Sequence, residues 1–222
     1  LIIVPLAMSA MLSLHSFGMY TGVTDDVSLA NYVEIFGDPY FHDIFLRTLR
    51  ISAFVTLLAM LMGAPEAYIL HRMCAPWRSL FLLVMLGPLL ISVVARTLGW
   101  AMLLGSNGII NQGLMGIGIL STPLKFMYTE TGVIIALAHV MLPFMVISVW
   151  ASLQKLDPQV ENAAVSLGAK PGTVIRRVVL PQIMPGILSG CIIVFALAAS
   201  AFATPAIIGG RRLKVAATLA YD

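Results

Sequence analysis

Apolar runs alternate with shorter polar stretches along the chain. Five of the runs approach or exceed the length of about 20 helical residues that crosses the hydrocarbon core of a bilayer. They cover residues 1–18, 46–70, 79–96, 131–153 and 186–207. The pattern predicts an all-α fold, a polytopic bundle of membrane helices forming one transmembrane domain over residues 1–222.

Polar segments connect the predicted spans, at residues 20–43, 71–78, 97–130 and 154–185. The first is acidic, and the third is rich in Gly, Asn, Ser and Thr, with a short helix expected after Asn107 or Asn111. The second and fourth carry Arg and Lys. If these two lie on one side, the positive-inside rule makes that side cytoplasmic.

Composition supports a location in lipid. Hydrophobic residues make up 59% of the chain and charged residues 10%, against about 25% charged residues in soluble domains. The net charge of +3 is small and its cationic residues are scattered, which excludes a nucleic-acid-binding stripe. Cys74 and Cys191 are the only cysteines, so neither a disulfide framework nor a metal cluster is expected.

The segment from 154 to 185 has the signals of two short helices. Asp157 is an N-cap acceptor and Pro158 suits the first helical position. Gly168 suits the helix end, and Pro171 is placed to open a second helix through about Val178. Leu180 and Pro181 are expected to close that second helix.

Many loops of this length could hold a helix pair, but the spacing here is specific. Residues 162–168 read N-A-A-V-S-L-G and are followed, after nine residues, by Val178 and then Leu180-Pro181. This arrangement resembles the E-A-A-x-x-x-G-x(9)-I-x-L-P signature of the permeases of binding-protein-dependent type I ABC importers. The resemblance implies a coupling loop that docks in a groove of a separate ATPase.

The resemblance implies ATPase-coupling roles for seven residues: Glu161, Asn162, Ala163, Ala164, Gly168, Leu180 and Pro181. The small alanines would let a partner come close, and Gly168 would permit the turn. In the family's Glu position this chain has Asn162. Glu161 lies one residue earlier, about 100° round a helix. Any charge pair that the family Glu makes with an ATPase is therefore not carried over to Asn162, which could retain a hydrogen bond.

Further segments look like permeases of the spermidine/putrescine type. They are P-L-L from Pro88, the stretch from Val94 to Trp100, L-L-G-S-N-G-I-I-N from Leu103, L-P-F-M-V from Leu142 and F-A-T-P-A-I-I-G-G from Phe202. Such permeases usually have a sixth span after the Gly-Gly loop, and the chain starts at Leu1 within an apolar run. We therefore expect the natural subunit to extend beyond both ends.

Five polar or aromatic residues are candidates for a substrate pathway: Arg96, Trp100, His139, Ser200 and Thr204. Ionisable groups within spans are costly and often functional. Each has an alternative role: Arg96 can extend to the interface, His139 can be a packed, hydrogen-bonded histidine, and the two hydroxyls can bond to their own helix. Ser200 and Thr204, four residues apart, are expected to share a helix face.

The cargo is predicted only coarsely. Polyamine-type permeases often read Gly-Asp-Phe before the Thr-Pro pair, whereas this chain has Ser200-Ala201-Phe202 and lacks that carboxylate. A polyamine is therefore one candidate cargo beside other small polar organic solutes, such as amino-alkyl phosphonates or opine-like compounds.

These observations predict a non-catalytic permease subunit in a bacterial inner membrane. No G-x-x-x-x-G-K-[ST] phosphate loop occurs in the 222 residues, so ATP and magnesium should be bound by a partner. The expected partners are a dimer of ABC ATPase subunits, a second permease, identical or homologous, and an extracytoplasmic solute-binding protein. The alternatives are a self-contained channel or secondary transporter, or an intramembrane enzyme.

Overall fold

A computed structural model describes residues 3–18 and 22–220 of the chain. Two compact units are distinguished, residues 1–47 and 48–222, and each is described by itself. Helix α3 (Pro39–Arg72) contributes residues to both units.

The first unit combines short helices with a small hairpin. Its elements are α1 (Ile3–Ser13), β1 (His15–Gly18), β2 (Gly22–Val27) and α2 (Ala30–Gly37). The strands pair antiparallel, with His15 opposite Val27 and Gly18 opposite Gly22. The side-chain amide of Asn31 donates to the carbonyls of Ser13 and His15, which ties α2 to the turn before β1.

The first unit differs from the sequence-based prediction of a span at 1–18. Helix α1 has 11 residues, and the hairpin that follows it was not predicted; residues 1 and 2 lie outside the described part. An 11-residue helix rises only about 17 Å, which is short of a bilayer core of about 30 Å.

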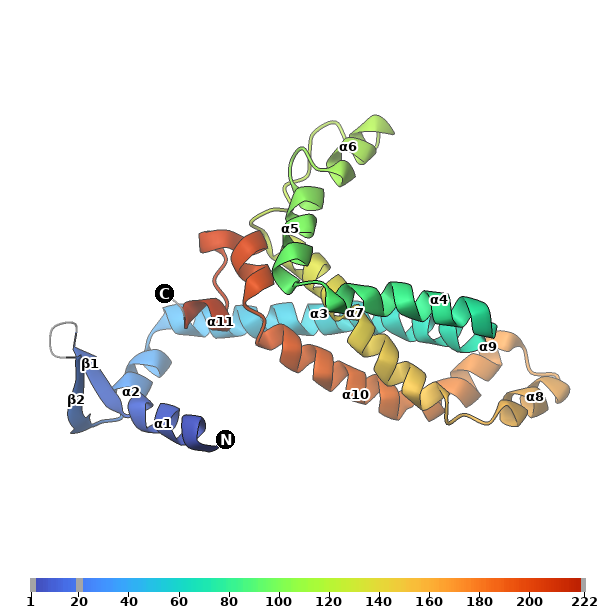
Figure 1. Cartoon of the computed structure of the whole chain (residues 1–222), viewed down its shortest axis with the longest axis horizontal. Coiled ribbons are helices and arrows are strands. Elements are labelled where there is room, and N and C mark those ends of the chain that lie inside the picture. Colours follow the sequence, from blue (N-terminus) through green and yellow to red (C-terminus); the bar gives the residue numbers. More distant parts are fainter. Residues whose placement is uncertain (1–2, 19–21, 221–222) are drawn as a thin grey trace. The chain divides into compact units, whose positions relative to one another are not determined.

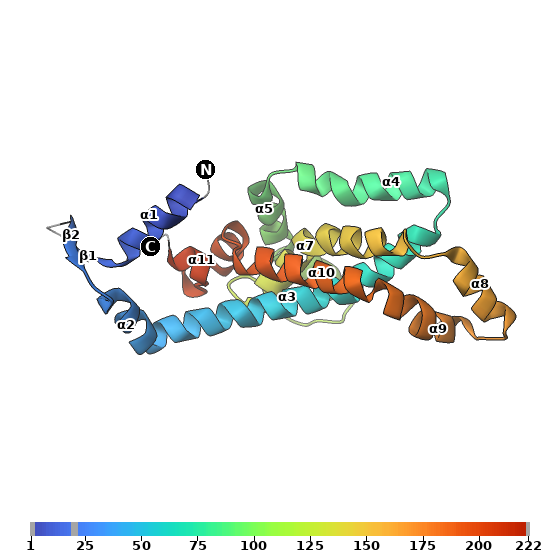
Figure 2. The same ribbon diagram turned by 90° about the horizontal axis from the view of Figure 1, so that it is seen from below.

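The second unit is a helical bundle (Figures 1 and 2). Besides α3 its α-helices are α4 (Ala75–Leu86), α5 (Val93–Leu104), α6 (Ile109–Gly116), α7 (Glu130–Leu153), α8 (Pro158–Ser166), α9 (Pro171–Val174), α10 (Leu180–Ala199) and α11 (Ala216–Leu219). Shorter 3-10 turns span Gly87–Leu90 and Gly210–Arg212, and π-helical turns span Ile175–Val179 and Pro205–Gly209. The helix expected after Asn107 or Asn111 is α6.

Four helical segments among the described residues are long and apolar enough to cross a membrane. They are Pro39–Arg72, Val93–Gly116, Glu130–Leu153 and Pro171–Ala199. Two of these segments cover the predicted spans at 46–70 and 131–153. Shorter apolar helices cover Ile3–Ser13 and Ala75–Leu90.

The predicted span at 79–96 is wrong as one continuous helix. Helix α4 ends at Leu86, a 3-10 turn follows, and α5 begins at Val93 after extended backbone at Ile91 and Ser92. Pro88 lacks the N–H of a helical hydrogen bond and its ring crowds the carbonyl four residues earlier. Here the α-helix ends just before Gly87-Pro88 and gives way to the 3-10 turn, and the helical backbone stops at Ile91. Pro143, in contrast, remains inside the continuous helix α7.

The core of the second unit lies where α3, α7 and α10 meet. Helix α7 has buried residues around most of its circumference, as expected for a helix covered on all sides. Glycines allow the close approach: an added Cβ would lie 2.8 Å from Met145 Cγ at Gly63, 2.3 Å from Ser152 Oγ at Gly186 and 2.7 Å from Met145 Sδ at Gly190. Small residues at such contacts are typical of membrane helix packing.

Candidate functional site

Helix α8 and the turn after it form as predicted. The Asp157 carboxylate accepts a hydrogen bond from the backbone N–H of Gln159 at 2.9 Å, so Asp157 is the N-cap. At the other end, Gly168 has φ +82°. The N–H of Gly168 donates to Val165 (2.9 Å) and that of Ala169 to Ala164 (3.1 Å). This paired arrangement is a Schellman cap, in which glycine is favoured because its φ is positive.

Glu161 faces the chain's own helices. It is buried, with 7% of its surface exposed, and its Oε2 accepts a hydrogen bond from Nη2 of Arg72 at the end of α3. Another hydrogen bond joins Arg72 Nη2 to the Tyr68 hydroxyl (2.8 Å), and the guanidinium lies 5.2 Å from the Tyr68 ring centroid. Glu161 was predicted as an ATPase-coupling residue, and in this structure its carboxylate binds Arg72 of the same chain.

Away from Glu161, most side chains of α8 and its following turn are exposed, and Asn162 also lines a small pocket with His71 and Arg72 of α3. Asn162 and Ala163 are exposed and Ala164 is half-buried. Two apolar side chains near them are also exposed, Val165 at 57% and Leu167 at 88%. Figure 1 shows α8 and α9 at one end of the bundle, where α7 ends and α10 begins. The predicted motif thus presents Asn162 and Ala163 outward and Glu161 inward.

Leu180 and Pro181 do not close the second helix, and this prediction is wrong. The helical segment runs without interruption from Pro171 to Ala199. The π-helical turn at Ile175–Val179 explains the continuity, because the Leu180 N–H bonds to the Ile175 carbonyl five residues earlier. This wider turn gives the Pro181 ring room beside the preceding carbonyls. Both Leu180 and Pro181 are exposed on the membrane-length segment.

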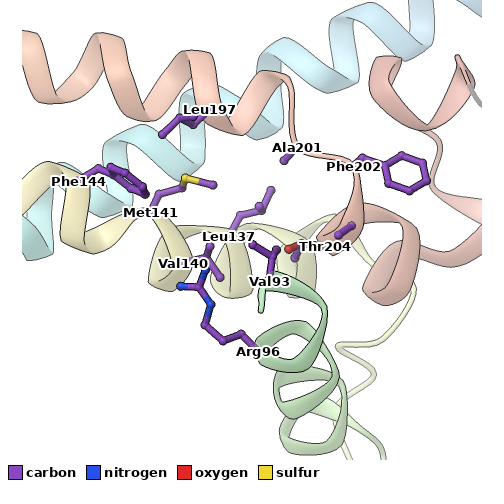
Figure 3. Close-up of a pocket in the computed structure, with 11 residues that line it drawn as sticks. Val93, Arg96, Leu137, Val140, Met141, Phe144, Leu197, Ala201, Phe202 and Thr204 are labelled. Atoms are coloured by element: carbon purple, nitrogen blue, oxygen red, sulfur yellow. The ribbon is translucent and has the colours of Figure 1, made fainter. Parts of the chain in front are cut away.

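A second candidate site is the arginine pocket between α5, α7 and the chain after α10 (Figure 3). Its volume is about 250 Å³, and its wall consists of Val93, Arg96, Leu137, Val140, Met141, Phe144, Leu197, Ala201, Phe202, Ala203 and Thr204. Arg96 extends from α5 and brings its guanidinium beside Val140 of α7 (Figure 3). Every other lining residue except Thr204 is apolar.

A pair of hydroxyls lies at the base of the arginine pocket. Thr204 Oγ1 and Thr97 Oγ1 are 3.0 Å apart and both residues are buried. Thr97 donates its proton to the Val93 carbonyl (2.8 Å), so Thr204 is the donor in the hydroxyl pair. The pair joins α5 to the segment after α10.

Ser200 and Thr204 do not share a helix face, contrary to the prediction. Helix α10 ends at Ala199, and the chain is non-helical at Ala201 and Phe202. Ser200 is exposed and donates to the Ala196 carbonyl (2.9 Å) within its own helix, while Thr204 lies in the pocket wall. The predicted span 186–207 accordingly begins earlier than expected and ends at Ala199.

Trp100 and His139 contact each other outside the wall of the arginine pocket. Trp100 Nε1 donates to His139 Nδ1 at 3.2 Å, and the rings meet edge to face with centroids 5.1 Å apart. Helix α5 is thereby joined to α7 one turn beyond Arg96. Sequence reasoning selected both residues separately and did not predict their contact.

Sequence reasoning also missed three residues of these sites: Tyr68, Arg72 and Thr97. Thr97 follows Arg96 directly but carries no distinguishing pattern. Arg72 was visible as a cation at the end of an apolar run, yet nothing local marks Glu161 as its partner 89 residues away. Among the described residues there is no group of three or more His, Cys, Asp or Glu side chains that could hold a metal ion.

A family model described as a binding-protein-dependent transport system inner membrane component matches residues 44–222. The chain belongs to this family. It is a multi-pass inner-membrane protein, and its second unit is an all-α bundle, as predicted, while the first unit adds the small β-hairpin.

Named relatives come from several transport systems. The spermidine/putrescine transport system permease protein PotB of Haemophilus influenzae is 33% identical over 84% of this chain and 65% of its own length. The Escherichia coli PotB is 32% identical over 83% of this chain and 67% of its own length. The molybdenum transport system permease protein ModB of Mycobacterium bovis is 32% identical, over 80% and 65%. The chain thus spans about two thirds of each relative.

Solved structures support the fold. A bacterial ABC transporter involved in the import of the acidic polysaccharide alginate matches with a TM-score of 0.78 at 19% identity, over 99% of this chain and 78% of that one. A bacterial alginate ABC transporter in complex with an alginate pentasaccharide-bound periplasmic protein matches with a TM-score of 0.73 at 20% identity, over 88% and 71%. This confirms the predicted type I importer permease architecture.

Proposed function

We propose that this chain is the permease subunit of an ABC importer and that α8 with its following turn receives the movement of a separate ATPase. The observation that carries the proposal is the exposed face of α8, with Asn162, Ala163 and Leu167 outward, in a chain of the binding-protein-dependent transport family. A capped helix between two membrane-length helices is a rigid element through which force on its outer face reaches both.

The Arg72–Glu161 contact extends this proposed coupling to a third helix. Helix α8 is connected covalently to α7 and, through Gly168, to the segment that becomes α10. The ion pair adds α3. Displacement of α8 would therefore act on α3, α7 and α10, the three helices that form the core of the bundle.

We propose that the chain itself performs no chemistry and binds neither ATP nor magnesium. The phosphate-loop motif is missing from its 222 residues, so hydrolysis would occur on a dimer of ABC ATPase subunits. The proposed assembly also contains a second permease, identical or homologous, and an extracytoplasmic solute-binding protein. The alginate relative solved with a periplasmic protein supports this kind of partner.

The proposed path for the cargo includes the arginine pocket. Arg96 and Thr204 lie in its wall, while Trp100 and His139 pack beside it and Ser200 is exposed at the end of α10. The cargo is proposed to be a small polar organic solute, in the range from polyamines to related amine, phosphonate or opine compounds. Relatives named for spermidine/putrescine and for molybdenum transport are both similar to this chain.

The proposal is tested with the full natural subunit expressed together with its genomic neighbours. Purification through a tag on this chain should yield an ATPase subunit. Uptake of cargo into right-side-out vesicles that enclose ATP should require a loaded binding protein outside. Uptake by this chain alone, without ATP, would identify a secondary transporter or channel and overturn the proposal.

A further inference from the structure

We propose that the cargo carries an anionic group, such as a carboxylate or phosphonate, and that Arg96 binds it in the arginine pocket. This inference rests on the proposed transport function and narrows the class of solute. It excludes linear polyamines, whose charged groups are all cationic.

The charge balance of the arginine pocket supports an anion. Eleven residues line the pocket, and Arg96 is the one formally charged residue among them. None of the eleven carries a carboxylate. Two acidic residues elsewhere in the second unit are already engaged, Glu130 with Arg50 and Glu161 with Arg72. An ammonium ion entering the pocket would meet a guanidinium without a compensating negative charge.

The guanidinium has hydrogen-bonding capacity to spare. Its Nε is buried without a hydrogen-bond partner in the part of the chain that the structure describes, and no described carboxylate lies within ion-pair distance of Arg96. An unpaired cation in an apolar setting is unfavourable. The planar donors of arginine fit the two oxygens of a carboxylate or phosphonate in a bidentate arrangement, so an oxyanion would remove the imbalance.

The backbone around the pocket is interrupted in two places. Extended residues Ile91 and Ser92 precede α5, and non-helical Ala201 and Phe202 follow α10. Val93 and Ala201, next to these breaks, line the pocket. Within a membrane, non-helical backbone is tolerated where it lies in protein or borders a polar cavity, and broken helices often mark transport sites. The breaks therefore support a ligand site here.

The size and lining of the arginine pocket restrict the part of the ligand that extends beyond its anionic group. A volume of about 250 Å³ is below the usual range of about 300–1,000 Å³ for drug-sized ligands. Apolar side chains, among them Leu137, Met141, Phe144 and Leu197, cover most of the wall. The ligand that fits both features is a small organic anion with a short apolar body and its charged end at Arg96.

The test measures ligand binding to the purified permease–ATPase complex in nanodiscs by saturation-transfer NMR. The probes are glutarate, 2-aminoethylphosphonate and putrescine, each alone and in competition. The wild-type complex should give signals with one or both anions and none with putrescine. Arg96→Gln should weaken anion binding at least tenfold and Arg96→Lys by less. Lys125→Gln, which removes an equal charge from an exposed loop position outside the pocket, should have no effect.

A reversed-charge variant sharpens the test. Ala201 lines the pocket, so Arg96→Gln combined with Ala201→Asp should abolish the anion signals and create one for putrescine. Gel filtration and the thermal midpoint show whether each variant is folded. If Arg96→Gln does not fold, competition on the wild-type complex still decides the issue.

Several outcomes would overturn the inference. They are putrescine binding as strong as anion binding, no signal from either anion, or anion binding unchanged in a folded Arg96→Gln complex, as expected if a second permease supplied a carboxylate to Arg96. Each leaves the proposed function standing as long as the complex retains ATP-driven uptake. Loss of an ATPase partner with intact anion binding would instead refute the proposed function.

Discussion

The guanidinium of Arg72, at the last residue of α3, donates a hydrogen bond to the carboxylate of Glu161 in α8. The acidic side chain is 9% exposed and the basic one 55%. Removing the arginine would leave a largely buried carboxylate without its partner, and that desolvation is the larger part of the cost.

Arg72→Ala should therefore destabilise the docked position of α8 by about 1–2 kcal/mol, with the exposed half of the arginine limiting the effect. Limited proteolysis within residues 154–170 should become faster, and stimulation of the associated ATPase by loaded binding protein should fall. Arg176→Ala, at an exposed cation in the π-helical turn Ile175–Val179, is the matched control. The exchange Arg72→Glu with Glu161→Arg should restore part of the protection; equal proteolysis of wild type and Arg72→Ala would contradict this account.

Any side chain at Gly168 should reduce ATPase association and transport. Its φ of +82° costs an L-residue roughly 1–2 kcal/mol, although nothing lies within 4 Å of an added Cβ. We expect Gly168→Val to reduce both ATPase association and transport. Gly172→Val adds the same side chain at a neighbouring helical position that is equally open, and it should affect association less. Co-purification yields of the two variants give the comparison, and equal yields would refute a role for the turn.

The sequence predicted this region well because its determinants are local. Asp157, Gly168 and the residues they bond to lie within a dozen positions, so capping rules apply directly. The Arg72–Glu161 and Thr97–Thr204 contacts join residues 89 and 107 positions apart, and only the packed fold brings them together. The effect of each proline on its helix also depends on the packed fold, so the sequence did not predict which prolines end a helix. Pro143 stays in a continuous helix, Pro181 is accommodated by a π-helical turn, and Pro88 follows a helix end.

The α7–α10 contact predicts a stability effect at Gly186. An added Cβ would lie 2.3 Å from Ser152 Oγ and 2.8 Å from the Ser148 carbonyl oxygen, and the latter is backbone that cannot rotate away. Gly186→Leu should separate the helices and lower the thermal midpoint of the detergent-solubilised subunit, with a cost of about 1–3 kcal/mol for overpacking. Gly113→Leu, where nothing lies within 4 Å, should shift the midpoint much less. A shift at Gly186 no larger than at Gly113 would show that the helices do not pack this closely.

The hydroxyl pair of Thr97 and Thr204 predicts that the stability costs of replacing these two residues do not add. Thr204→Val removes the donor and leaves buried Thr97 with an unfilled acceptor, at a cost of about 1 kcal/mol. Changing both residues to Val should cost less than the sum of the single changes, because two apolar groups can pack without an unpaired partner. A thermal double-mutant cycle measures the coupling, and strict additivity would mean that the hydroxyls do not interact.

If the exposed face of α8 touches an ATPase, a cross-linker attached to this face should reach the ATPase subunit. In a full-length subunit with Cys74 and Cys191 replaced by alanine, Leu167→Cys puts a thiol at a position that is 88% exposed. Ile119→Cys, at a position 67% exposed in the segment after α6, is the matched control. Each thiol is labelled with a maleimide-benzophenone, which on irradiation inserts into C–H bonds within its reach. The label on Leu167→Cys should cross-link to the ATPase subunit, with a yield that changes on adding ATP, and the label on Ile119→Cys should not. No cross-link from Leu167→Cys in a complex that hydrolyses ATP would contradict the account.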